Sequence, residues 1–118
     1  MGQRSSNNGF VEVLKCGGDL NANSMVKIKH RVDHLLKRNH RLMLLDLSNT
    51  RHIDLAGLGI LVERLKMVRS VQGDIKLCRL SSHINEIFRL VGVSKLFETY
   101  ETPEDAKASF HHGAAARG

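Results

Sequence analysis

The chain is poor in aromatic residues and in proline. Its 118 residues include no Trp, one Tyr, four Phe and one Pro, so Leu, Ile, Val and Met must fill most of any core. The length suits one domain and leaves little room for two, but it is sufficient to bury a core. The hydrophobic fraction of 42% and the charged fraction of 25% are ordinary for a globular domain.

Long hydrophobic runs are absent as well. No apolar stretch approaches the roughly 20 residues that a membrane-spanning helix needs. The first ten residues, MGQRSSNNGF, lack the apolar segment of a secretory signal. We therefore expect a cytoplasmic protein without membrane insertion.

Residue patterns for catalysis or metal binding are also lacking. The two cysteines, Cys16 and Cys78, have neither metal-ligand nor redox-motif spacing, which predicts reduced and partly buried thiols. His52 and Asp54 have no nucleophile or metal-ligand partner in the surrounding sequence. No Gly-x-x-x-x-Gly-Lys phosphate loop is present. We expect a protein that is not an enzyme and holds no cofactor or metal.

Strand and helix patterns alternate along the chain. Asn23 or Ser24 can cap the first helix, which ends near Asn39, and Asp54 can cap the second. Ser82 can cap a short third helix, and Thr102-Pro103 with the acids that follow predicts a helix to Phe110. Strands are predicted at 10–14, 42–47, 75–80 and 96–100. The strand–helix–strand unit at 42–80 implies a right-handed parallel crossover.

The composition of the two ends predicts the domain boundaries. Residues 1–9 are polar and rich in Asn and Ser, which favours a flexible arm. The periodic patterns fill residues 10–110. The remaining segment, 111–118, is predicted to be a disordered tail.

Three segments together resemble the STAS domain, the fold of bacterial anti-sigma factor antagonists. They are GDLN at 18–21, LLDLS at 44–48 continuing to IDLAGLG at 53–59, and FRLVGVSKLF at 88–97. The resemblance implies a single α/β domain with a mixed sheet of four to five strands and about four helices, mainly on one face. Family members usually begin with an additional strand, and only nine polar residues are available for it here.

The resemblance also implies a regulatory function. Antagonists of this family bind a kinase-like anti-sigma factor, which phosphorylates a serine directly after the aspartate that corresponds to Asp54. Leu55 occupies that position in this chain and cannot accept phosphate. We therefore expect non-catalytic binding without phosphorylation at the usual site. Ser48 and Thr50 lie in the preceding loop, but neither matches the family's position.

The family's binding loop and first turn supply the predicted partner contacts. These are Asp19, Asn21, Asn23, Asp54, Leu55, Ala56, Gly57 and Leu58. Leu55 is either an exposed binding residue or part of the core. Gly57 and Gly59 either admit a partner's backbone or pack the helix tightly on the sheet. The protein is expected to be a monomer or a weak homodimer.

The net charge of +6 leaves other partners open. Lys27, Arg31, His34 and Arg38 fall on one face of the predicted helix at 24–39. Nucleic acid would need such a face, but no recognisable nucleic-acid motif accompanies it. A solvated face or an acidic protein partner is favoured. A further alternative is a scaffold or adaptor subunit of a larger signalling or transport complex.

Overall fold

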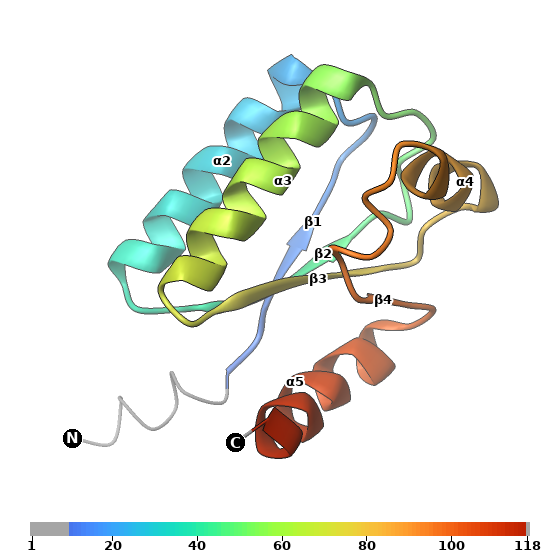
Figure 1. The fold of residues 1–118 in the computed structure, drawn as a ribbon. Helices are drawn as coiled ribbons and strands as arrows, with labels where there is room; N and C mark the ends of the chain where they lie inside the picture. Colours follow the sequence, from blue (N-terminus) through green and yellow to red (C-terminus); the bar gives the residue numbers. More distant parts are fainter. Residues whose placement is uncertain (1–9, 118) are drawn as a thin grey trace.

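The computed structural model describes residues 10–117, with side chains described as far as His111. The predicted arm at 1–9 lies outside this range. Strands and helices alternate from one end of the described chain to the other (Figure 1). The strands are β1 (Glu12–Lys15), β2 (Leu42–Asp46), β3 (Asp74–Cys78) and β4 (Thr99–Tyr100). The helices are α2 (Ala22–Lys37), α3 (Leu55–Ser70), α4 (Ser82–Leu90) and α5 (Pro103–Arg117).

The four strands form one sheet in the order β1-β2-β3-β4. All three neighbouring pairs are parallel, so the described sheet is purely parallel rather than mixed as predicted. The β2–β3 register places Leu44 opposite Lys76 and Leu45 opposite Leu77. β2 is buried along most of its length, as a central strand with helices on both faces must be.

Helices cover the two faces of the sheet unequally. α2 and α3 lie side by side over one face, whereas α5 lies on the other (Figure 1). The main core contains Ile84 and Phe88 of α4 together with the buried residues of α2 and α3. A smaller core joins Leu44 and Cys78 of the sheet to Ala106 and Phe110 of α5. Three of the four helices thus contribute to one core, which agrees with the prediction.

Several predicted boundaries need correction. α2 begins at Ala22 and its N-cap is Asn21, which precedes both predicted caps, Asn23 and Ser24. The N-cap of α4 is Ser81, not Ser82. β4 contains only Thr99 and Tyr100, because the residues before it form turns.

α5 differs from its prediction at one end only. It starts at Pro103 as predicted, and the Thr102 hydroxyl accepts a hydrogen bond from the Asp105 N–H at 3.1 Å. The helix then continues past Phe110 to Arg117. The segment predicted as a disordered tail is therefore largely helical. No helix among residues 10–117 is long and apolar enough to cross a bilayer.

Candidate functional site

The predicted binding loop and the predicted first turn are joined by a short parallel bridge. Leu20 pairs with Ile53; the Leu20 N–H donates to the His52 carbonyl at 2.9 Å, and the Asp54 N–H donates to the Leu20 carbonyl at 3.0 Å. Helices that follow parallel strands start at the same end of the sheet. The starts of α2 and α3 are therefore held together, although about 33 residues separate them in the sequence.

Both helix starts are capped by side chains of the predicted site. The Asp54 carboxylate accepts the Gly57 N–H at 2.7 Å, which confirms Asp54 as the N-cap of α3. Asn21 and Ser24 form a capping box: the Asn21 side chain accepts the Ser24 N–H at 2.9 Å, and the Ser24 hydroxyl accepts the Asn21 N–H at 3.0 Å. These caps fix the backbone of both helix starts.

Asp19 ties the turn to the loop that precedes α3. Its carboxylate accepts hydrogen bonds from the Arg51 N–H at 3.3 Å and the His52 N–H at 3.1 Å. Nearby, the buried Thr50 donates its hydroxyl to the Gly18 carbonyl at 2.9 Å. The position of Thr50 is thus that of a turn residue, whereas Ser48 is exposed.

The predicted contact residues divide by exposure. Leu55 is 71% exposed, which answers the question left open by the sequence: this leucine does not enter the core. Asn23, Asp54 and Ala56 are exposed with it. We call the set that can meet a partner the helix-start surface; it comprises Asp19, Asn21, Asn23, Asp54, Leu55 and Ala56.

Gly57 and Leu58 do not belong to that surface, because both are buried. Leu58 packs in the main core. A Cβ on Gly57 would lie 2.7 Å from the Leu20 carbonyl oxygen, so the absence of a side chain lets α3 approach the turn before α2. Of the two roles that the sequence left open for Gly57, its burial and this close approach favour packing within the fold.

The start of α4 adds a residue that the sequence prediction missed. The rings of His52 and His83 meet edge to face, with centroids 6.1 Å apart. His83 thus extends the exposed rim of the site from the loop before α3 to the start of α4. The sequence held a signal for His83. A helix capped near Ser82 after a parallel strand starts at the same end of the sheet as α2 and α3.

The two thiols offer no nucleophile at this site. Burial raises the pKa of Cys16 to about 12, with the Asp46 carboxylate acting in the same direction and a hydrogen bond with Thr50 partly opposing it. Burial and the same carboxylate raise the pKa of Cys78 to about 11. Both thiols are therefore neutral at pH 7. Among the described residues no group of three or more His, Cys, Asp or Glu could hold a metal ion.

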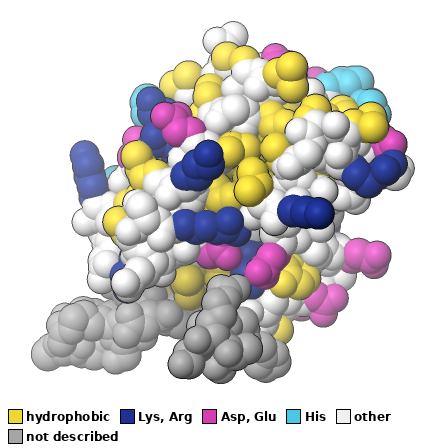
Figure 2. Space-filling view, in the orientation of Figure 1, with side chains coloured by type: hydrophobic (Ala, Val, Ile, Leu, Met, Phe, Trp, Pro, Cys, Tyr) yellow, Lys and Arg dark blue, Asp and Glu magenta, His cyan; other side chains and the backbone are white. Residues whose placement is uncertain are grey.

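On the side of the molecule seen in Figure 1, hydrophobic side chains gather between α3 and α4, with Lys and Arg side chains around them (Figure 2).

A family model for the STAS domain matches residues 6–106. The chain belongs to the STAS domain family. The match covers every described strand and helix through the start of α5.

Similar proteins of known name are bacterial. This STAS domain is 29% identical over 93 residues to BtrV of Bordetella bronchiseptica, whose name proposes it as an anti-sigma factor antagonist; the match covers 79% of this chain and 80% of BtrV. It is 26% identical over 81 residues to the anti-sigma-B factor antagonist of Listeria monocytogenes, covering 69% and 71% of the two chains.

A solved structure supports the same fold. The crystal structure of TM1081 from Thermotoga maritima matches this STAS domain with a TM-score of 0.77 and 25% identity. The match covers 84% of this chain and 86% of that one. The predicted fold class is confirmed apart from the parallel pairing of the described strands.

Proposed function

We propose that this STAS domain is an anti-sigma factor antagonist that binds a kinase-like anti-sigma factor in the cytoplasm and is not phosphorylated at Leu55. The names of BtrV and of the Listeria relative support the role and favour it over a scaffold or adaptor subunit. The domain acts by binding, as a monomer or a weak homodimer, and not by catalysis. Its partner contacts the helix-start surface.

The observation that carries the proposal is the exposure of Leu55. A leucine that is 71% exposed at the first position of α3 exposes apolar area that a partner can bury. Two capped helix starts and the Asp19 hydrogen bonds hold the surrounding backbone. Little ordering is then required on binding, which favours affinity.

The same position argues against regulation by phosphate at the usual site of the family. The free N–H groups and the dipole at a helix start would favour a phosphate there, and phosphorylation would add a charge of about −1.5 to −2. Leucine has no hydroxyl to receive it. The antagonist therefore binds irrespective of kinase activity at this position, and its level in the cell or competing partners set the outcome.

The test is calorimetric binding to the cognate anti-sigma factor, with and without ATP. We expect the wild type to bind equally in both conditions and to incorporate no phosphate. Leu55→Ser loses about tenfold in affinity, since burying a leucine contributes roughly 1.5–3 kcal/mol. With ATP, this variant gains phosphate and dissociates further.

Leu90→Ser is the matched control. Leu90 is 72% exposed but lies at the end of α4, so the same substitution there leaves the affinity unchanged. Wild-type protein that incorporates phosphate from ATP and then dissociates would contradict the proposal. Equal losses from both substitutions would contradict the assigned surface.

A further inference from the structure

Two neighbouring apolar side chains remain exposed where α4 ends. Leu90, the last residue of the helix, is 72% exposed, and Val91, its C-cap, is 42% exposed. The chain is described on both sides of them, from α3 through β4. Single exposed apolar residues are common on protein surfaces, whereas a continuous apolar patch marks a contact with a partner. The surroundings of these two residues therefore decide what they mean.

A fixed turn holds this end of α4 in place. Gly92 follows the C-cap with a φ of 83°, a conformation that favours glycine. The Gly92 N–H donates to the Arg89 carbonyl at 3.2 Å. The Val93 N–H donates to the Phe88 carbonyl at 3.0 Å. These are the two hydrogen bonds of a Schellman motif, which ends a helix and turns the chain. The surface around Leu90 is therefore preformed, and a partner needs to order little of it.

The turn also joins the end of α4 to α3. The Leu96 carbonyl accepts a hydrogen bond from the Arg69 guanidinium of α3 at 2.7 Å. Val62 lies seven residues before Arg69 and thus on the same side of α3. Val62, Val93 and Leu96 are half-buried and pack against the main core. They continue the apolar surface toward α3, where Figure 2 shows hydrophobic side chains gathered. We call this set the α4-end patch; it comprises Val62, Leu90, Val91, Val93 and Leu96.

The rim of the α4-end patch is positively charged, and Figure 2 shows Lys and Arg side chains around the apolar surface. Lys66 lies four residues after Val62 on the same side of α3, and Lys95 precedes Leu96. Both lysines are exposed, and neither is among the ion pairs found between described residues. Two acids of the flanking segments are already paired within the domain, in Arg69–Asp74 and Arg89–Glu86. The two lysines are therefore available to acids of a partner.

We propose that the α4-end patch docks an amphipathic helix of a second partner protein, whose acids pair with Lys66 and Lys95. An amphipathic helix presents an apolar stripe with charged residues on both sides, which matches an apolar patch between cations. A second copy of the chain would bring these cations together across a symmetric interface. The patch contains no aromatic residue to anchor it in the interfacial region of a membrane.

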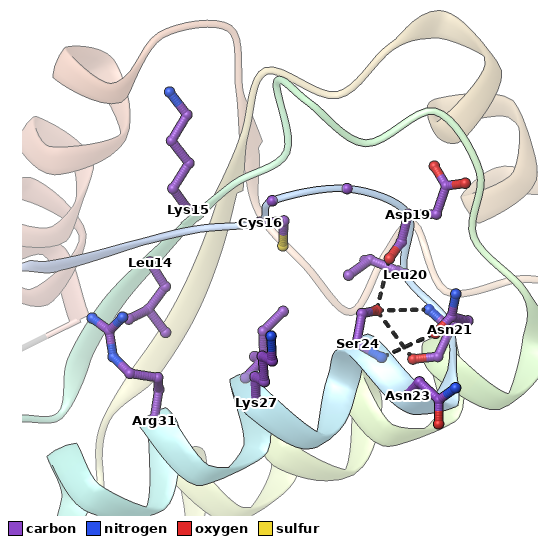
Figure 3. Close-up of a pocket in the computed structure, with 13 residues that line it drawn as sticks. Leu14, Lys15, Cys16, Asp19, Leu20, Asn21, Asn23, Ser24, Lys27 and Arg31 are labelled. Atoms are coloured by element: carbon purple, nitrogen blue, oxygen red, sulfur yellow. Dashed lines mark hydrogen bonds between the residues drawn. The ribbon is translucent and has the colours of Figure 1, made fainter.

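The α4-end patch lies apart from the helix-start surface and shares no residue with it. His83 at the start of α4 is roughly 10 Å along the helix from Leu90 at its end. By contrast, a hollow of about 750 Å³ beside β1 is lined by Asp19, Asn21 and Asn23 (Figure 3), so it belongs with the helix-start surface. The proposal goes beyond anti-sigma factor binding, for which Leu90→Ser is expected to leave the affinity unchanged.

The first experiment measures fluorescence anisotropy of a labelled peptide of about 16 residues, long enough to form a helix, with Leu at i, i+3, i+4 and i+7 and Glu beside them. We expect saturable binding that weakens about tenfold in Leu90→Ser/Val91→Ser, since the apolar contact is lost. The matched control, Met67→Ser/Val71→Ser, removes two exposed apolar side chains from the side of α3 opposite Val62. It should retain the affinity, and circular dichroism verifies that both variants fold. Equal weakening in the control would overturn the proposal.

Charge reversal tests the acidic character of the partner. Lys66→Glu/Lys95→Glu should weaken binding about tenfold, since two attractive pairs become repulsive. Lys29→Glu/Lys37→Glu makes the same change in net charge at two exposed residues of α2 and should retain the affinity. A second peptide with Lys in place of Glu should bind the wild type about tenfold more weakly. Equal affinity for the two peptides, or equal weakening in the two charge variants, would contradict the stated chemistry and overturn the proposal.

Methyl NMR of the wild type locates the bound peptide. At saturation, the methyl signals of Leu90, Val91 and Leu96 should shift, whereas those of Leu55 should not. Shifts at Leu55 without shifts at Leu90 would assign the peptide to the helix-start surface and overturn the proposal. The absence of saturable binding up to about 1 mM peptide would also overturn it.

Two other occupants are tested with the same variants. Co-sedimentation with vesicles of anionic phospholipid that is lost in Leu90→Ser/Val91→Ser would assign the patch to a membrane and overturn the proposal. A dimer seen in analytical ultracentrifugation of the wild type and lost in this variant would assign it to a second copy and also overturn it. None of these assays contains an anti-sigma factor, so failure here is distinct from failure of the proposed function.

Discussion

At the residue scale, two glycines of α3 lie in opposite surroundings. Both Gly57 and Gly59 are part of the sequence motif, and the sequence left their role open between partner contact and packing. A Cβ on Gly57 would lie 2.7 Å from the Leu20 carbonyl oxygen, whereas a Cβ on Gly59 would meet nothing within 4 Å. The difference arises from the bridge between Leu20 and Ile53, a tertiary contact that no local pattern encodes.

Substitution by alanine should therefore have opposite effects at the two positions. Gly57→Ala forces α3 away from the turn before α2 and should lower the free energy of unfolding by about 1–3 kcal/mol. Gly59→Ala, at an exposed position within the helix, should raise it by up to about 1 kcal/mol. Urea unfolding of both variants measures the sign directly. A Gly57→Ala variant that is more stable than the wild type would contradict the close approach of α3 to the Leu20 backbone.

At the element scale, local signals placed the starts of α3 and α5 correctly, whereas α2 and α4 start earlier than predicted because Asn21 and Ser81 cap them. Asp54 and Thr102-Pro103 mark their helices correctly, because a cap acts through neighbouring N–H groups. The end of α5 and the extent of the short β4 were predicted less well. The bridged binding segments were expected from the family resemblance, whereas the burial of Gly57 and the hollow beside β1 required the structure.

The contact between α2 and α3 includes an ion pair that periodicity does not predict. Leu58, Leu61, Leu65 and Val68 recur at helical spacing along α3, and all four are buried. Arg64 is buried beside them, and its guanidinium donates to the Asp33 carboxylate of α2. The side chain of Arg64 is 6% exposed, compared with 37% for Asp33. The pair is therefore asymmetric in its access to water.

This asymmetry predicts unequal effects of removing each partner. Asp33→Ala leaves a buried guanidinium without its main partner and should lower the free energy of unfolding by about 1–3 kcal/mol. This loss is smaller than that expected for a fully buried ion pair, because Asp33 reaches solvent. Arg64→Met leaves a carboxylate that water can solvate, so it should lower the free energy of unfolding by less than about 1 kcal/mol. A double-mutant cycle by chemical denaturation measures both values and their coupling. Equal costs would contradict the asymmetry.

At the scale of the whole molecule, the smaller core under α5 and the proposed binding surface lie on different sides of the sheet. α5 covers one face through the smaller core (Figure 1), and the helix-start surface lies where the helices of the other face begin. The buried Lys76 of β3 also joins the sheet to α5. Its ammonium lies 4.5 Å from the centre of the Phe110 ring and 2.8 Å from the Ser109 hydroxyl. α5 thus supports the domain without any residue in the proposed binding surface.

Phe110→Ala should therefore reduce stability without changing affinity. Phe110 is 4% exposed, and its truncation opens a cavity against Leu44 and Cys78 that should cost about 3–5 kcal/mol. Thermal unfolding measures this loss, and calorimetry well below the transition should give the wild-type affinity for the anti-sigma factor. Phe10→Ala is the matched control, because Phe10 is 52% exposed and its truncation should cost much less. If folded Phe110→Ala bound several-fold more weakly, the two sides of the sheet would be coupled, and the separation of stability from binding would fail.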